Sequence, residues 1–237
     1  LENKYIKEPY EKIYSEVKQK PGVYTKSELM RKLTISLSPI NTLIKNGFLC
    51  INKAVVNRYN TREYALYGKK QLNADQLRAI ESILHSTNDI FLLQGVTGSG
   101  KTEVYMSLVE EKMKEGLSSI ILVPEISLTP QMVERFKGRF GNDIAIFHSR
   151  LSEGERYDEW FRVKNNKVKL AIGARSAIFL PFDNLGLIVV DEEHENSYKS
   201  DSSPKYHVRD IARVISENTG CKVVFGSATP SIEAFYQ

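Results

Sequence analysis

The residues best suited to chemistry in this sequence form one glycine-rich stretch, which fits the pattern GxxxxGK[ST]: Gly95-Val96-Thr97-Gly98-Ser99-Gly100-Lys101-Thr102. Glycines let backbone amides curl around an anion at positive φ, and the N-terminus of a following helix favours negative charge. A lysine in this position reaches the outer phosphates of a nucleotide, and the next hydroxyl ligates Mg²⁺. The stretch therefore predicts a site for ATP and Mg²⁺, with Lys101 and Thr102 as central contacts.

A second candidate site follows an apolar run at 187–190, which leads directly into Asp191, Glu192, Glu193 and His194. In P-loop enzymes a second apolar strand ends in an aspartate that holds the magnesium ion, so we expect Asp191 to be the second Mg²⁺ ligand. Glu192 is then expected to orient and deprotonate the attacking water. An acidic turn alone would be an ordinary solvated loop. Its pairing with the glycine-rich stretch about ninety residues upstream favours catalysis.

Both stretches need a scaffold that brings strand ends together, and the sequence around them alternates apolar runs with helical periodicity. Strands are expected at 90–94, 120–123, 144–147, 170–172, 187–190 and 223–225, and helices after the glycine-rich stretch and at 129–140, 153–164 and 208–216. This alternation is typical of an α/β fold with a mostly parallel, doubly wound sheet. We predict a RecA-like P-loop lobe over residues 68–237.

The front of the chain has another pattern, with a linker at 1–8 and a small domain at 9–67. Three short helices are indicated by the apolar stripe from Tyr10 to Val17, the capping box from Thr25 to Glu28 and the Ser38-Pro39 start. Short strands at 48–51 and 54–58 would complete a winged-helix domain. The third helix of such a domain usually enters the major groove of DNA, and its outward residues here would be Asn41, Thr42 and Lys45.

Charge is distributed unevenly between the two parts. Residues 1–70 hold 14 Lys and Arg against six Glu, a net charge of +8, while the remaining residues carry −4. An excess of positive charge favours a polyanionic partner such as DNA. Winged helices also serve as protein-docking modules, and a lysine-rich solvated surface would have the same composition, so both alternatives stay open.

Composition limits the remaining possibilities. The chain is 41% hydrophobic and 26% charged, its longest apolar runs are too short to cross a bilayer, and it opens without a secretory leader. Cys50 and Cys221 lie far apart with no CxxC spacing, which favours two reduced thiols over a disulfide or a zinc site. These features predict a cytoplasmic protein without a membrane partner, and the initial Leu1 suggests a fragment.

Several motifs together resemble those of superfamily 2 DNA helicases, and most specifically the replication-restart helicases with a DEEH box. The stretches that carry the resemblance are GVTGSGKT, LVPEISLTPQ (122–131), IGARSAIFLPF (172–182), VVDEEHENSYK (189–199) and FGSATPSIE (225–233). They look like motifs I, Ia, Ib, II and III, and they cover the chain from about residue 72 to its end.

The resemblance implies a role for each matching residue. It implies that Lys101, Asp191 and Glu192 are catalytic and that His194 couples hydrolysis to DNA. It further implies an adenine contact for Gln76, a single-strand path along Ser127, Thr129, Arg175 and Ser176, and relay of the nucleotide state through Ser227 and Thr229. His148 lies where the family has a His-Ser pair, and we expect it to be structural.

The segment from Ser197 to His207 resembles the aromatic-rich loop of this family. Aromatic rings stack on any base and cations contact phosphate, so such a loop can sense single strands without reading sequence. Tyr198 and Tyr206 are the expected stacking residues, and Lys199 and Arg209 the expected phosphate contacts. Packing of the two tyrosines against the lobe is the alternative.

The resemblance implies an ATP-dependent 3′ to 5′ helicase that acts at stalled or forked DNA in replication restart, with single-strand-binding protein and primosome loader proteins as partners. It also implies zinc-binding cysteines and a second lobe, expected beyond Gln237, so the fragment alone is expected to be nearly inactive. Two other readings remain open: a DNA translocase or remodeller that does not unwind forks, and a nucleotide-switched binding module.

Overall fold

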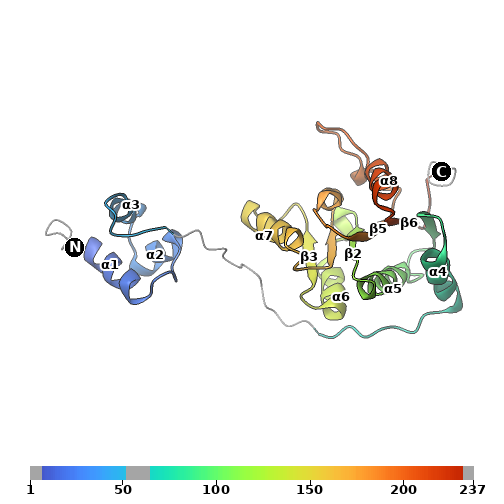
Figure 1. Cartoon of the computed structure of the whole chain (residues 1–237), viewed down its shortest axis with the longest axis horizontal. Helices are drawn as coiled ribbons and strands as arrows, with labels where there is room; N and C mark the ends of the chain where they lie inside the picture. Colours follow the sequence, from blue (N-terminus) through green and yellow to red (C-terminus); the bar gives the residue numbers. More distant parts are fainter. Residues whose placement is uncertain (1–6, 52–64, 232–237) are drawn as a thin grey trace. The chain divides into compact units, whose positions relative to one another are not determined.

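The computed structural model describes residues 7–51 and 65–231 (Figure 1). The chain divides into two compact units, residues 1–57 and 58–237. Sequence analysis placed this boundary ten residues later, after residue 67. Tyr67 belongs with the second unit, because its backbone N–H donates to the carbonyl of Gly138 at 3.1 Å.

The first unit contains the three predicted helices, α1 (Tyr10–Gln19), α2 (Lys26–Leu33) and α3 (Leu37–Lys45). They enclose a small core of Ile13, Leu29, Ile40 and Leu43. Both hydrogen bonds of the Thr25–Glu28 capping box are formed, as the sequence predicted. The N-cap of α3 is Ser36 rather than Ser38, so this helix begins about half a turn earlier than expected.

Only the first of the two predicted wing strands lies within the described residues. Residues 48–51 form no strand, and residues 54–58 lie outside the described residues. On α3, Asn41 and Lys45 are exposed, whereas Thr42 is half-buried and its hydroxyl donates to the carbonyl of Ser38 at 3.0 Å. The winged-helix assignment therefore remains a prediction.

The second unit is built on a six-stranded parallel sheet, as predicted. Its strands are β1 (Ile90–Gln94), β2 (Ser118–Leu122), β3 (Ile144–Phe147), β4 (Leu170–Gly173), β5 (Leu185–Asp191) and β6 (Lys222–Ser227). Their order across the sheet is β1-β6-β5-β2-β4-β3. The chain therefore places β6 and β5, which come last, between β1 and β2, which come first.

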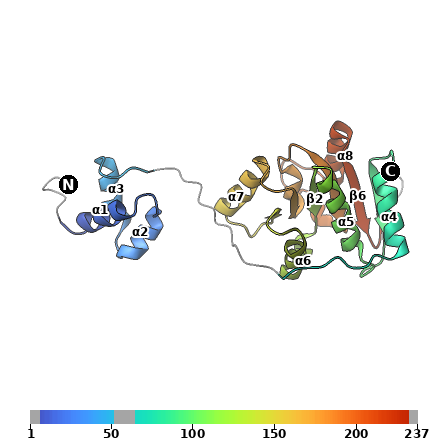
Figure 2. The ribbon, with the colours of Figure 1, turned by 60° about the horizontal axis from the view of Figure 1, so that its bottom comes forward.

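Helices cover both faces of this sheet, because strands buried on both sides need apolar partners on both sides. One core joins α4 (Ala74–His85), α5 (Lys101–Lys114) and α6 (Pro130–Phe140) to alternate strand residues such as Ile121 and Val189. The other core joins α7 (Glu153–Lys164) and α8 (Val208–Thr219) to the intervening strand residues, such as Ile120 and Ile188. Figure 2 shows α5 between α4 and α6. The predicted doubly wound lobe is confirmed.

An extended segment that precedes α4 is fastened to α5 and α6. The Tyr67 hydroxyl donates to Glu103 Oε1 at 2.8 Å, and Arg139 pairs with Glu103 and Glu110 at 2.6 and 2.7 Å. Lys69 also pairs with Glu110. Gly138 lies against this segment, since a Cβ there would come within 3.0 Å of the Tyr67 amide nitrogen. The segment is therefore held along the outside of the lobe before it enters α4.

No helix in the two described ranges is both long and apolar enough to cross a membrane.

The two cysteines are predicted to differ sharply in reactivity. Cys50 is exposed, whereas Cys221 is buried directly before β6, and burial, aided by the negative charge of Asp89, raises the pKa of Cys221 to about 12. At pH 8 its thiolate fraction would be about one part in ten thousand. We expect Ellman's reagent to label one thiol per native chain and both in guanidinium chloride. Cys50→Ser should abolish native labelling; rapid labelling of this variant would contradict the packing of β6.

Candidate nucleotide site

The glycine-rich stretch lies between β1 and α5, at the carboxyl edge of the sheet. Gly98 and Gly100 have φ values of 83° and 84°, which side chains rarely adopt, and Gly100 is the N-cap of α5. Helix α5 therefore begins at Lys101, with its N-terminus facing the loop. This is the strand, loop and helix arrangement that the phosphate-binding motif requires.

Gln76 lies against this loop from the first turn of α4. Its side chain completes a capping box with Asn73, and its Nε2 donates to the carbonyl of Ser99 at 2.9 Å. A side chain at Gly100 would collide with Gln76 Nε2. The predicted nucleotide residue Gln76 is thus in contact with the predicted phosphate loop, while its contact with adenine remains a prediction.

The lysine of the loop points toward the acidic strand end. Lys101 Nζ donates to the carbonyl of Gly95 at 2.7 Å and lies 3.9 Å from Glu192 Oε1. Its side chain is 9% exposed, so little water screens this charge. The two motifs, about ninety residues apart in sequence, therefore meet at one place.

Asp191 ends β5 and is held from α5. Its Oδ1 accepts a hydrogen bond of 2.8 Å from the hydroxyl of Tyr105, which is fully buried. Burial, reinforced by the charges of Asp191 and Glu192, raises the pKa of Tyr105 well above its usual value, so this phenol remains a donor. Burial also raises the pKa of Asp191, against the lowering effect of the Tyr105 hydrogen bond. Sequence analysis predicted a helix here but assigned no role to Tyr105.

The backbone turns sharply directly after Asp191. Glu192 has φ of 47°, in the left-handed region that costs a residue with a side chain roughly 1–2 kcal/mol. Its carboxylate lies 3.9 Å from Lys101 Nζ and 3.8 Å from His194 Nδ1. Strain of this kind persists where the surrounding structure imposes it, and it is often found at functional sites.

Glu193 anchors the turn, a role that sequence analysis did not assign. It is 2% exposed and forms a 2.7 Å ion pair with Arg209 Nη2. Its Oε1 also accepts from the backbone N–H of Ser231 at 2.8 Å, and Arg209 Nη2 donates to the Ser231 hydroxyl at 2.9 Å. The pair connects the acidic turn to α8 and to the segment after β6.

His194 and Ser227, two residues predicted for the coupling of hydrolysis to DNA, lie in contact in the structure. His194 Nδ1 lies 2.8 Å from the Ser227 hydroxyl, and the backbone N–H of Thr229 donates to that hydroxyl at 3.1 Å. The imidazole therefore contacts motif III directly, and the same Nδ1 atom also faces Glu192 Oε2 at 3.8 Å. This geometry is suited to coupling the two motifs, which remains a proposal.

Two of the expected DNA contacts need correction. Tyr198 is 1% exposed, and its hydroxyl donates to the backbone carbonyls of Asp191 at 2.5 Å and Leu122 at 3.1 Å, so in this structure it cannot stack on a base. The packing alternative holds for Tyr198. Arg209 is paired with buried Glu193, so its guanidinium is not free to meet phosphate.

The rest of the loop is nearer the surface. Tyr206 is half-buried, makes an edge-to-face contact with Phe179 at 5.1 Å and lies 5.7 Å from the Arg175 guanidinium. Arg175 donates to the backbone carbonyls of Ser197 and Lys199, and Lys199 itself is exposed. The predicted motif Ib arginine therefore holds the loop that follows motif II.

The predicted DNA residues of motifs Ia and Ib lie at the same edge of the sheet. Thr129 is the N-cap of α6 and accepts from the backbone N–H of Met132 at 3.3 Å. Ser127 lies in the 3₁₀ turn η2 (Glu125–Ser127), and Ser176 in η3 (Arg175–Phe179). Both turns follow the carboxyl ends of β2 and β4, where ligands of parallel sheets bind.

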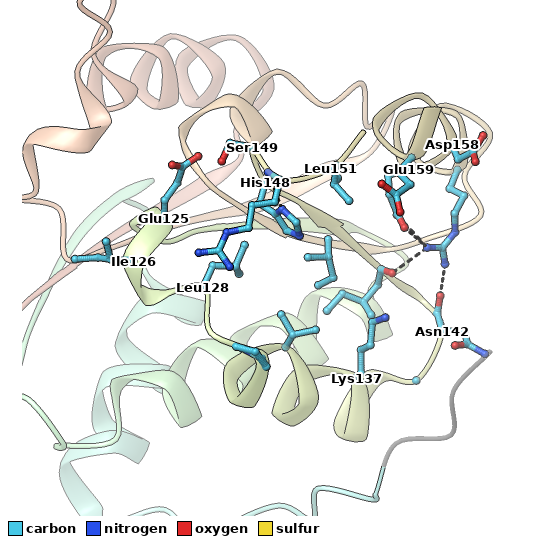
Figure 3. A pocket seen from close by; sticks show the side chains of 18 residues that line it. Glu125, Ile126, Leu128, Lys137, Asn142, His148, Ser149, Leu151, Asp158 and Glu159 are labelled. Atoms are coloured by element: carbon cyan, nitrogen blue, oxygen red, sulfur yellow. Dashed lines mark hydrogen bonds and ion pairs between the residues drawn. The ribbon is translucent and has the colours of Figure 1, made fainter. Parts of the chain in front are cut away.

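A separate pocket of about 750 Å³ lies between α6, α7 and β3 (Figure 3). His148, Glu125 and Arg162 line it, and Arg162 donates to the carbonyls of Asn142 and Ile144. Burial, with a smaller effect from Arg150, lowers the pKa of His148. The pocket contains none of the nucleotide residues, and the structural role of His148 remains a prediction.

The donor set at the strand ends suits a magnesium ion bound with a nucleotide. Mg²⁺ prefers hard oxygen ligands, which the Thr102 hydroxyl and the Asp191 carboxylate supply. Ser99 Oγ is buried in the loop without a hydrogen-bond partner, which suits a hydroxyl that donates to a bound phosphate. Among the described residues, no group of three His, Cys, Asp or Glu could bind a metal ion alone. In nucleotide sites Mg²⁺ is usually bound by one or two carboxylates together with substrate phosphates and waters, which would supply the further ligands.

The fold and site together define a P-loop nucleotide-binding lobe with an acidic metal motif. Residues 73–236 match the family described as DEAD/DEAH box helicase. The chain belongs to the DEAD/DEAH box helicase family.

The chain is also similar to curated proteins called replication restart protein PriA. It is 47% identical to that of Bacillus subtilis over 215 residues, which cover 88% of this chain and 27% of that protein. For Synechocystis the identity is 40% over 230 residues, which cover 93% of this chain and 27% of that protein. The resemblance to replication-restart helicases is confirmed, and this chain spans about 27% of the length of these relatives.

Solved structures agree on the fold. RecG bound to a three-way DNA junction matches with a TM-score of 0.52 and 23% identity over 70% of this chain and 22% of that one. The Hef helicase domain of Pyrococcus furiosus matches with a TM-score of 0.52 and 21% identity over 68% and 34%. At these identities the likeness shows the RecA-like fold alone.

Replacing the lysine of the loop should weaken nucleotide binding strongly. Because Lys101 is the cation aimed at the outer phosphates, we expect Lys101→Ala to weaken binding of a fluorescent ATP analogue by about tenfold or more, as loss of a charge-assisted contact would. Lys114→Ala, on the exposed end of the same helix, is the control. Unchanged affinity of Lys101→Ala would contradict the site.

Proposed function

We propose that this chain is the first ATPase lobe, with a preceding DNA-contacting domain, of a PriA-type 3′ to 5′ DNA helicase. The full-length protein would act at stalled or forked DNA in replication restart and primosome assembly. The observation that carries the proposal is the convergence of Lys101, Asp191 and Glu192 at the carboxyl edge of the sheet. The identity to replication restart proteins over most of this chain supports the biological role.

The proposed chemistry is phosphoryl transfer from ATP to water. Lys101 would leave the Gly95 carbonyl to contact the outer phosphates, and Thr102 and Asp191 would hold Mg²⁺, which neutralises charge on the phosphates. Glu192 would orient the water and accept its proton. His194, whose Nδ1 faces both Glu192 and Ser227, would report the state of the site to motif III.

DNA is proposed to run across the ends of β2 and β4, near Ser127, Thr129, Arg175 and Ser176. Lys199 and Tyr206 stay candidates for contact with single strands, since both lie outside the buried anchor formed by Tyr198. As PriA-type proteins act in replication restart, single-strand-binding protein and primosome loader proteins are the proposed partners. The first unit would contact DNA through α3.

The two alternative functions differ in what the full-length protein does. A translocase or remodeller would use the same ATPase site without separating strands, and a forked substrate in a strand-displacement assay distinguishes it from a helicase. In a nucleotide-switched binding module the first unit would dock a protein. Neither alternative gains support from a particular contact in the structure.

The role of Glu192 is best measured in the full-length protein from which this chain comes. We propose that the chain alone hydrolyses ATP negligibly, because P-loop enzymes of this kind depend on an arginine finger from another lobe. In the full-length protein, Glu192→Gln should keep ATP affinity but reduce DNA-stimulated turnover by roughly 10²–10⁴-fold, as expected for loss of a general base. Glu195→Gln is a nearby control. Normal turnover of Glu192→Gln would contradict the assignment of the base.

DNA contact by the first unit predicts a steep dependence on salt. If α3 contacts phosphates, the logarithm of the binding constant of the chain for fluorescent duplex DNA should fall linearly with the logarithm of the salt concentration, and Lys45→Ala should reduce the slope by about one. Lys18→Ala, on α1, is the matched charge control. Binding that is absent at low salt, or that ignores Lys45, would favour the protein-docking alternative.

A further inference from the structure

One buried side chain connects the two elements that would share the magnesium ion. Tyr105 lies on α5, one turn after Lys101, and its hydroxyl reaches across to Asp191 Oδ1 at 2.8 Å. The two proposed ion ligands, Thr102 and Asp191, come from α5 and β5. Their separation therefore depends on how these elements are held together.

The phenol is well suited to fix that separation. Tyr105 is fully buried, so neither its ring nor its hydroxyl can turn toward solvent. A tyrosine has only two side-chain torsions, and a packed ring leaves the hydroxyl in one place. Because the phenol donates to Oδ1, it turns the other carboxylate oxygen of Asp191 away from itself and leaves it available to the ion.

The neighbouring strand makes room for this contact. Gly226 on β6 is the register partner of Asp191, and a Cβ there would overlap the Tyr105 hydroxyl oxygen, lie 2.9 Å from Tyr105 Cζ and lie 3.3 Å from Asp191 Oδ1. Gly226 is not among the glycines with positive φ. The glycine in FGSATP is thus required for space rather than for backbone conformation.

We propose that Tyr105 is a positioning residue for magnesium: its hydroxyl orients the Asp191 carboxylate toward the ion, and Gly226 leaves the space that this requires. The proposal rests on the proposed ATP site. Tyr105 acts through Asp191 and contacts neither nucleotide nor ion. Tyr198 holds the backbone carbonyl of the same aspartate from the other side, so the phenol of Tyr105 governs only the carboxylate.

The test measures the affinity of the 237-residue chain for a fluorescent ATP analogue, once with MgCl₂ and once with EDTA. The readout is the ratio of the two dissociation constants, which reports the gain from the ion and requires no hydrolysis. Tyr105→Phe keeps the ring and removes the hydroxyl. We expect affinity in EDTA to stay within about twofold and the magnesium-dependent gain to fall about five- to tenfold, the scale of the net contribution of one hydrogen bond.

Tyr67→Phe is the matched control, because it removes another phenol that donates to a carboxylate of α5, Glu103, at the same 2.8 Å distance. Its magnesium-dependent gain should be unchanged. An unchanged or larger gain in Tyr105→Phe would overturn the proposal, as would equal losses with and without magnesium. A wild-type chain that binds no ATP analogue at all would overturn the proposed function as well, which distinguishes the two failures.

Gly226→Ala provides an independent variant. Its methyl group must displace the phenol from Asp191, so we expect the same selective loss of the magnesium-dependent gain, with folding checked by circular dichroism. In a Tyr105→Phe background the hydroxyl is already gone, so adding Gly226→Ala should reduce the gain little further. Additive losses would contradict a shared effect through the phenol.

Discussion

The structure depends most on the register of three neighbouring strands, β1, β6 and β5. Gln94 pairs with Ser227 and Asp191 with Gly226, so the three carboxyl ends finish at the same level. The loop after β1 carries Lys101, the end of β5 carries the carboxylates, and the end of β6 carries Ser227. Successive side chains of a strand point to opposite faces of the sheet. A slip of the strand pairing by one residue would therefore turn every side chain to the other face and separate these groups.

The sharp turn that follows β5 has an energetic cost, which buried polar contacts offset. Glu192 lies in a strained backbone region, and Glu193, directly after it, is an almost fully buried anion. Burial of a charge is tolerated only when it is paired and its oxygens are bonded, and Glu193 meets this condition through Arg209 and Ser231. The ion pair therefore fixes the path of the chain where Glu192 must turn.

Much of this arrangement could be predicted because its signals are local. The strand at 90–94, the helix at 153–164 and the strand at 144–147 were predicted to the residue, since apolar runs and capping residues mark their limits. The pairing of the glycine-rich loop with Asp191 also followed from sequence, because each motif has fixed spacing. The start of α3 was misplaced, because Ser36 and Ser38 are both acceptable N-caps and local sequence does not separate them.

What sequence could not provide is which polar atoms are buried together. Tyr105 has the spacing of a core residue, and only the position of β5 shows that its hydroxyl reaches Asp191. Tyr198 follows the acidic motif in a polar loop, where exposure was the natural expectation. In the structure its ring packs in the core, and its hydroxyl donates to the carbonyls of Asp191 and Leu122, which end two different strands.

The burial of Tyr198 changes how a DNA signal would reach the metal site. If Lys199 and Tyr206 contact single strands as proposed, any shift they transmit along the loop meets Tyr198 first, and through it the backbone of Asp191. Arg175 holds the same loop by the carbonyls of Ser197 and Lys199, on either side of Tyr198. A tyrosine exposed for stacking could not serve as this connection, because its hydroxyl would be in water. Tyr198 is therefore the anchor of the loop and contacts the backbone of the proposed metal ligand Asp191, while Lys199 and Tyr206 are the proposed DNA-sensing residues.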